Sequence, residues 1–334
     1  MADNLFCLDI GEKYTKVVDA AKKNDAIDLR SIGKIETVPT FYSSDVEKTM
    51  EDQGTVTNQL VNSLGITKKS VNVIIPGSFT YSQILEMPLL NEKELISAIK
   101  YQADRFIPMP IDETNIDLEI IEEYKEERKI LILIVAAPKK LIEKVQTTVE
   151  SIGLIPEIIE NELSASARFA NSFNTHLGKG GVVLANIGLN STSLSYYENG
   201  GKDLKESHTF SIGYHLFLKE IQINTNSDSQ KAAEILATFD LKGKSSYPVD
   251  VIAAPLIKEF SSELKRFVAA KKVDSVFLFN QAYLFPSLSS FIKQGIGIPT
   301  YELNPYNFTT KSPLVESHKT ELSLYISSIG GNLR

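Results

Sequence analysis

Two short phrases of the chain join a polar side chain to a glycine turn and could bind phosphate. Asp9 stands just before Ile10-Gly11, and Asn186 stands just before Ile187-Gly188, about half the chain away. Each phrase follows an apolar run and precedes a segment typical of a second strand, which predicts a β-hairpin. Glycine lets the backbone approach a ligand closely, and exposed N–H groups in such a turn bind phosphate oxygens. Two hairpins facing each other across a cleft would hold a nucleoside triphosphate between two lobes, whereas the alternative is two unrelated hairpin turns.

The composition is that of a globular protein and argues against nucleic-acid, zinc and membrane-spanning functions. A length of 334 residues suggests about two domains, and the 43% hydrophobic and 23% charged content is not that of a disordered chain. The net charge of −7 and the lack of a basic stripe argue against nucleic-acid binding. Four scattered histidines and one cysteine, Cys7, offer no zinc-ligand spacing and no internal disulfide. No apolar run approaches the ~20 residues of a membrane span and the start lacks a secretory pattern, so we expect a cytoplasmic protein without direct membrane insertion.

The order of predicted elements repeats between the two halves of the chain. Three short strands open each half, at residues 5–10, 14–20 and 27–36 and again at 182–186, 191–197 and 207–211. A helix and a buried strand follow in each half, at residues 45–64 and 70–75 and again at 255–270 and 276–279. Hairpins followed by helix and strand, twice over, predict two related α/β lobes.

An additional stretch in the first half predicts a helix and a hairpin of its own. Asn91 is a favourable N-cap with Glu94 three positions on, and apolar residues follow at helical spacing as far as Phe106. Two prolines, the first of them Pro108, then end the helix because proline cannot continue it. A hairpin with a charged tip is predicted at residues 115–136.

The element order and one motif together resemble a known family. The order resembles the actin-like ATPase fold shared by actin, the heat-shock chaperone ATPases and FtsA. The predicted helix ends in the segment FIPMPIDE, residues 106–113, which is similar to the signature of the PilM family of type IV pilus machines. The resemblance runs nearly end to end, from about residue 5 to residue 331.

The resemblance implies an α/β protein with the actin-like ATPase fold, in which two related α/β lobes enclose a nucleotide cleft. It also implies an extra small α+β subdomain, like subdomain 1C of that family, inserted in the first lobe. On this basis we expect the first lobe at residues 1–165, the insertion at about 70–155 and the second lobe at 166–334.

The resemblance further implies that the two hairpin loops bind ATP and Mg²⁺. Carried over position by position, the nucleotide-binding residues are Asp9, Gly11, Glu12, Lys13, Tyr14, Thr15, Lys16, Asn186, Gly188, Asn190, Ser191, Thr192 and Glu234. Asp9 would orient Mg²⁺ through water, which suits a cation that keeps its hydration shell, and Lys16 would reach a phosphate.

Three departures from the family pattern indicate a weakened nucleotide site. The second loop opens with Asn186 where the pattern has aspartate, which removes a charge that holds Mg²⁺ or activates water. The adenosine-side turn reads NQAY at residues 280–283, without the expected glycines. Glu234 is kept on the helix that faces the ribose, but an apolar residue replaces the lysine of that helix. We therefore expect poor or absent hydrolysis and assign no catalytic residue, with an active ATPase that regulates pilus assembly as the alternative.

The resemblance also implies a partner. The PilM family binds the short cytoplasmic N-terminal peptide of PilN, a single-pass inner-membrane protein, in a groove between the first subdomain and the small one. Such a groove recognises an extended segment by backbone hydrogen bonds and apolar pockets. We expect Arg105, Phe106, Ile107 and Pro108 to contact the peptide, although core packing explains Phe106 and Ile107 equally well. An adaptor of this kind would lie at the cytoplasmic face of the inner membrane through its partner, with other pilus-machine subunits as further candidates, and an FtsA-like cell-division protein is the remaining alternative.

Overall fold

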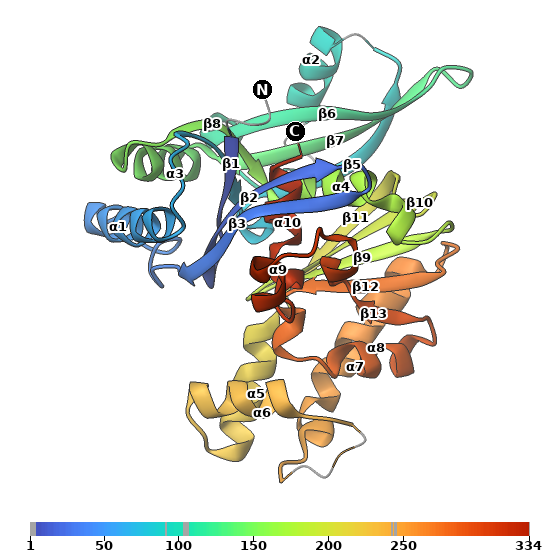
Figure 1. The fold of residues 1–334 in the computed structure, drawn as a ribbon. Helices are drawn as coiled ribbons and strands as arrows, with labels where there is room; N and C mark the ends of the chain where they lie inside the picture. Colours follow the sequence, from blue (N-terminus) through green and yellow to red (C-terminus); the bar gives the residue numbers. More distant parts are fainter. Residues whose placement is uncertain (1–4, 91, 103–106, 242, 244–245, 334) are drawn as a thin grey trace.

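Two five-stranded mixed sheets with the same internal order form the two lobes of the molecule (Figure 1). The computed structural model describes residues 5–90, 92–102, 107–241, 243 and 246–333. The first sheet has the order β3-β2-β1-β4-β8 and consists of β1 (Leu5–Ile10), β2 (Tyr14–Lys23), β3 (Ala26–Glu36), β4 (Ser70–Ile75) and β8 (Ile155–Asn161). The second has the order β11-β10-β9-β12-β13 and consists of β9 (Val182–Ile187), β10 (Thr192–Glu198), β11 (Asp203–Phe210), β12 (Ser275–Asn280) and β13 (Thr300–Glu302). In each sheet an antiparallel meander of three strands continues into two parallel strands, so the predicted repeat is confirmed.

The two glycine turns are closed by equivalent backbone hydrogen bonds. The N–H of Gly11 donates to the carbonyl of Tyr14 at 3.1 Å, and the N–H of Gly188 donates to the carbonyl of Ser191 at 2.8 Å. A Cβ added at Gly11 or Gly188 would lie 2.8 or 2.9 Å from that same carbonyl oxygen. Both turns therefore depend on the missing side chain, as the sequence indicated.

Helices cover both sheets and complete three hydrophobic cores. The first sheet packs against α1 (Glu47–Ser63) and α3 (Lys139–Ser151). The second packs against α5 (Tyr214–Thr225), α6 (Ser229–Thr238), α7 (Val249–Val268) and α8 (Leu288–Ile296). Between the lobes, a shared core contains side chains of α4 (Glu162–Ser172), α9 (Pro313–Ser317) and α10 (Ile326–Gly331). Single 3-10 turns connect these elements: η2 (Gly77–Phe79), η4 (Ile111–Glu113), η5 (Asn174–His176), η6 (Gln281–Leu284), η7 (Pro305–Phe308) and η8 (Leu322–Tyr325).

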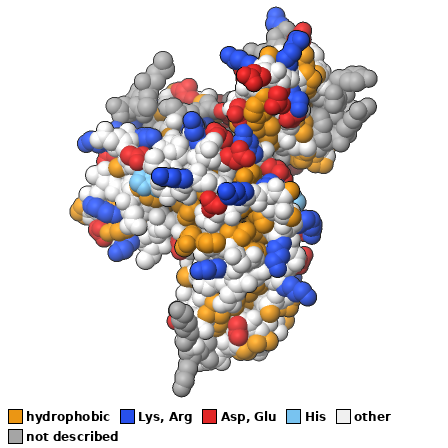
Figure 2. Space-filling view, turned by 90° about the vertical axis from the view of Figure 1, so that its right-hand side faces the viewer, with side chains coloured by type: hydrophobic (Ala, Val, Ile, Leu, Met, Phe, Trp, Pro, Cys, Tyr) orange, Lys and Arg blue, Asp and Glu red, His pale blue; other side chains and the backbone are white. Residues whose placement is uncertain are grey.

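A third sheet stands out from the first lobe at the top of Figures 1 and 2. It has the order β5-β7-β6 and consists of β5 (Tyr81–Pro88), β6 (Thr114–Tyr124) and β7 (Lys129–Pro138), with α2 (Glu92–Gln102) packed on it through Leu95 and Ile99. Strand β4 pairs within the first sheet, and α3 packs against that sheet. We therefore propose that the insertion spans residues 81–138, which is shorter than the expected range of about 70–155. On the face seen in Figure 2, Lys and Arg side chains alternate with acidic and apolar ones.

The residues after α9 return to the first lobe. The side chain of Asn332 donates to the carbonyl of Val18 at 3.0 Å and accepts from the N–H of Ala20 at 3.2 Å. Helix α10 lies so close to α4 that a Cβ at Gly330 would be 1.9 Å from the carbonyl oxygen of Ala165. The expected second lobe at 166–334 therefore contributes its last helix to the core of the first.

Candidate functional site

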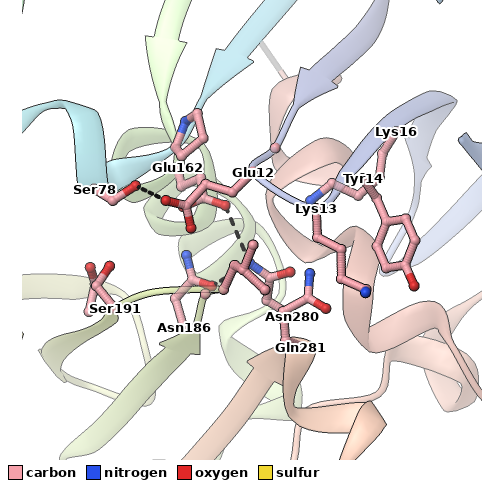
Figure 3. A pocket seen from close by; sticks show the side chains of 15 residues that line it. Glu12, Lys13, Tyr14, Lys16, Ser78, Glu162, Asn186, Ser191, Asn280 and Gln281 are labelled. Carbon is pink, nitrogen blue, oxygen red and sulfur yellow. Dashed lines mark hydrogen bonds between the residues drawn. The ribbon is translucent and has the colours of Figure 1, made fainter. Parts of the chain in front are cut away.

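The two glycine turns face each other across a narrow cavity between the lobes (Figure 3). The cavity has a volume of about 20 Å³, and its wall combines both hairpin tips with the start of α4 and the end of β12. The expected nucleotide-binding residues that line it are Gly11, Glu12, Lys13, Tyr14, Lys16, Asn186, Gly188 and Ser191. Folding thus brings together most of the two loops that the sequence singled out.

Asp9 and Lys16 form a buried ion pair at the base of the first turn. They are cross-strand partners in the β1–β2 register, with Nζ of Lys16 2.8 Å from Oδ2 of Asp9. The Ser328 hydroxyl donates to the same oxygen at 2.9 Å, while Oδ1 of Asp9 has no partner in the described part of the chain. The charge of Lys16 is therefore balanced within its own lobe. Among the described residues no cluster of three or more His, Cys, Asp or Glu side chains could hold a metal ion, so Asp9 as a Mg²⁺ residue stays a prediction.

Glu12 reaches across the cleft from the first turn. Its Oε2 accepts from the N–H of Asn190 at 3.2 Å. Its Oε1 accepts from Nδ2 of Asn190 at 3.2 Å. The same oxygen accepts from the Ser78 hydroxyl at 2.8 Å (Figure 3). One carboxylate of the first lobe is therefore bonded to the turn of the second.

A buried carboxyl group that the sequence analysis did not predict, Glu162, closes the back of the cavity. It is the first residue of α4, and it accepts from the N–H of Gly77 at 3.1 Å and from Nδ2 of Asn280 at 3.3 Å. The same Nδ2 donates to Oδ1 of Asn186 at 2.8 Å, which links the second loop to the end of β12. Burial, and then the negative charge of Asp9, raises the pKa of Glu162 to about 7.

Aromatic and charged side chains contact one another beside residues 280–283, where the resemblance places the adenosine. Lys34 on β3 donates to the hydroxyl of Tyr283 at 3.5 Å and forms an ion pair with Glu321. Its ammonium group lies 5.4 Å from the ring centre of Tyr14 and 5.5 Å from that of Tyr283. Burial raises the pKa of the Tyr283 hydroxyl. Asn280 keeps a φ of +65°, the conformation glycine adopts freely, at the turn that lacks the expected glycines.

Five of the expected residues do not line this cavity, and Asp9, buried beneath the first turn, is one of them. Thr15 and Thr192 are buried, the first bonded to Thr37 and Gln53 and the second to the carbonyl of Ile212. Asn190 contacts Glu12 and lines a neighbouring polar depression between β5 and β11. Glu234 is exposed on α6, where it pairs with Lys231 at 2.9 Å and lines a separate depression of about 230 Å³.

The space between the glycine turns is narrow, and it adjoins a cavity of about 540 Å³ that shares Ser78, Glu162 and Asn186 with it. Pockets for small molecules measure roughly 300–1,000 Å³, whereas the space between the turns is about 20 Å³. Glu12 and Glu162 line this space together with Lys13 and Lys16, so its wall carries side chains of both charge signs.

Of the residues expected to contact a partner peptide, the structure describes Ile107 and Pro108, which follow α2 beside the small sheet. Ile107 is 4% exposed and packs with Ala136, in a small core that includes Tyr81, so core packing is its observed role. Pro108 is exposed. Arg105 and Phe106 lie outside the described residues. Beside this core, η2 carries a ring that stacks on the loop before α1, with Phe79 and Tyr42 ring centres 4.4 Å apart.

Two lobes of matching strand order around a cleft, with a small inserted sheet, define the class of actin-like ATPase folds. The ethanolamine utilization protein EutJ from Carboxydothermus hydrogenoformans is similar in structure, with a TM-score of 0.55 and 12% identity over 98% of this chain and 88% of that one. A structure described as the PilM-PilN type IV pilus biogenesis complex is similar with a TM-score of 0.84 and 17% identity over 99% of both chains. The family described as type IV pilus assembly protein PilM matches residues 7–334, and the chain belongs to this family.

The family assignment confirms the resemblance drawn from the motif at residues 106–113, and the similar structures confirm the fold class inferred from the order of elements. No helix in the described ranges is long and apolar enough to cross a lipid bilayer.

Proposed function

We propose that the chain is an adaptor of a type IV pilus assembly machine and binds the cytoplasmic N-terminal peptide of a PilN-like inner-membrane protein. One observation carries this proposal: the similarity to the PilM-PilN complex structure extends over 99% of both chains and so includes the projecting small sheet. The family assignment supports the pilus role over an FtsA-like role in cell division. The adaptor would work at the cytoplasmic face of the inner membrane, held there by its partner.

The junction between the first lobe and the small sheet offers the chemistry for an extended peptide. The half-buried rings of Tyr42, Phe79 and Tyr81 lie along it, with Met109 and the exposed Pro108 after α2. Apolar side chains beside exposed backbone suit a segment whose alternate residues enter pockets. This junction borders the cavity between the glycine turns, since Ser78 of η2 lines that cavity and bonds to Glu12.

The test is a pull-down of the chain by an immobilised peptide copying the N-terminal tail of the PilN-like protein. We expect Phe106→Asp to abolish capture. Ile96→Asp on the neighbouring helix α2, where the side chain is 38% exposed, serves as the matched control and should be captured like the wild type. Thermal unfolding of both variants separates lost binding from lost folding. Capture of a folded Phe106→Asp variant at the wild-type level would show that the peptide lies elsewhere.

A nucleotide-regulated ATPase is the second candidate, favoured by two observations. Both glycine turns keep the geometry that suits phosphate, and Oδ1 of Asp9 has no donor among the described residues. Titration with a fluorescent ATP analogue and a phosphate-release assay test this candidate. Saturable micromolar binding with turnover would favour the enzyme over the plain adaptor.

A further inference from the structure

The bridge between the two glycine turns is a carboxylate of the chain itself. Glu12 lies between Gly11 and Lys13 in the first turn, and its two oxygens accept three hydrogen bonds. Two of the donors belong to Asn190 in the second turn, and the third is the Ser78 hydroxyl. The bridge therefore connects the lobes at the mouth of the cleft.

The donors that Glu12 uses are of the kind that would bind a phosphate. A backbone N–H exposed by a glycine turn is a phosphate donor, and a carboxylate offers the same negative charge and paired oxygens. In a cleft of this construction a bound anion would bond to both turns and hold the lobes together. Here the side chain of Glu12 accepts those hydrogen bonds from Asn190 and Ser78.

We propose that Glu12 is a built-in anion that occupies the phosphate position between the turns and holds the lobes closed without a nucleotide. This inference does not rest on the peptide-binding role, because it concerns only the contacts between the lobes. On this proposal, a phosphate that enters between the turns must compete with Glu12 for Asn190 and Ser78.

The remaining contacts across the cleft limit how far the lobes open when Glu12 is removed. On the far side, Lys34 still pairs with Glu321 and bonds to Tyr283. At the back, α4 and α10 remain packed together. Loss of Glu12 therefore opens the mouth while the back acts as the hinge, which is the geometry of domain closure around a ligand.

The experiment measures the distance between the lobes by fluorescence energy transfer. Cys7 is buried, so dyes attach to cysteines introduced at the exposed positions Thr55 on α1 and Ser290 on α8. The variant is Glu12→Ala, and the matched control is Glu36→Ala, an exposed glutamate at the end of β3. Inorganic tripolyphosphate is the probe anion, and partner peptide is left out.

We expect Glu12→Ala to lower the transfer efficiency and tripolyphosphate to restore it. We also expect this variant to bind tripolyphosphate at least about tenfold more tightly than the wild type, because the competing carboxylate and its repulsion are gone. The wild type and Glu36→Ala should keep a high efficiency with or without the anion. If Glu12→Ala does not fold, Glu12→Gln carries the same test, since it removes the charge and keeps the size. A folded Glu12 variant with the wild-type efficiency and the wild-type anion affinity would overturn the proposal, whatever the peptide assay shows.

Discussion

Lys16→Met is the sharpest test of how the base of the first turn is held together. Asp9 is fully buried. Two donors stabilise its charge: the ammonium group of Lys16 at 2.8 Å and the hydroxyl of Ser328 at 2.9 Å. Methionine keeps most of the side-chain volume but leaves the Asp9 carboxylate in the core with one neutral donor. Breaking a buried ion pair from one side costs about 3–5 kcal/mol. We expect the free energy of unfolding to fall by that amount, a large part of the total for most domains.

The measurement is urea unfolding followed by circular dichroism, with the double variant Asp9→Asn/Lys16→Met as the control. Removing both charges leaves no unpaired ion, so the double variant should be more stable than Lys16→Met and within about 1 kcal/mol of the wild type. A single variant as stable as the wild type would refute the reasoning, because it would mean that Asp9 does not depend on Lys16. In that case Lys16 would be free to serve a ligand, as the family resemblance implied.

Three further predictions concern single positions around the cleft. The pKa of Glu162 is about 7 in the folded protein against 4.5 ordinarily, so the folded protein keeps a proton that the unfolded chain releases. The free energy of unfolding should therefore fall as the pH rises from about 4.5 to about 7, by at most about 3 kcal/mol, and urea titrations of Glu162→Gln should lack this slope. Gly330→Ala should lower the free energy of unfolding by about 3 kcal/mol, because its Cβ would lie 1.9 Å from a backbone oxygen. In the same unfolding assay, the control Gly77→Ala should be as stable as the wild type, because the nearest atom to its Cβ is 3.7 Å away. Asn186→Asp restores the carboxylate of the family pattern. We still expect no saturable micromolar binding of a fluorescent ATP analogue, because Tyr283 and Lys34 lie where the adenosine would have to bind. Such binding would show that the missing charge alone had weakened the site.

Local signals predicted the hairpins and the inserted helix well. The glycine turns at Gly11 and Gly188 could be predicted from residue type, because no side chain fits beneath the carbonyl that closes each turn. The helix was predicted from its apolar spacing, and α2 is observed from Glu92 to Gln102. The predicted cap Asn91 and the predicted last turn at residues 103–106 lie outside the described residues. The Asp9–Lys16 ion pair could also have been predicted, since residues at equal distances from a hairpin turn face each other across the strands.

Features that depend on distant pairing escaped prediction. Strand β5 is half polar and becomes a strand only by pairing with β7, some fifty residues later in the chain. Glu162 has the sequence context of an ordinary acidic residue in a first helical turn, which favours an exposed position. Its burial follows from the approach of β12 and the second loop, and no local pattern encodes that approach. The contact of Glu12 with Asn190 has the same origin.

The return of residues 326–332 to the first lobe has a consequence for how the protein is made. Asn332 holds the backbone of β2 through partners 312 and 314 positions away in the chain, and α10 packs against β1. During translation the ribosome releases β1 and β2 long before their final packing partners exist. One face of the first sheet can pack on α1 and α3 early, whereas the face that α10 covers stays exposed until the last residues are made. We therefore expect that face, and not the whole first lobe, to be the part that chaperones protect until synthesis ends.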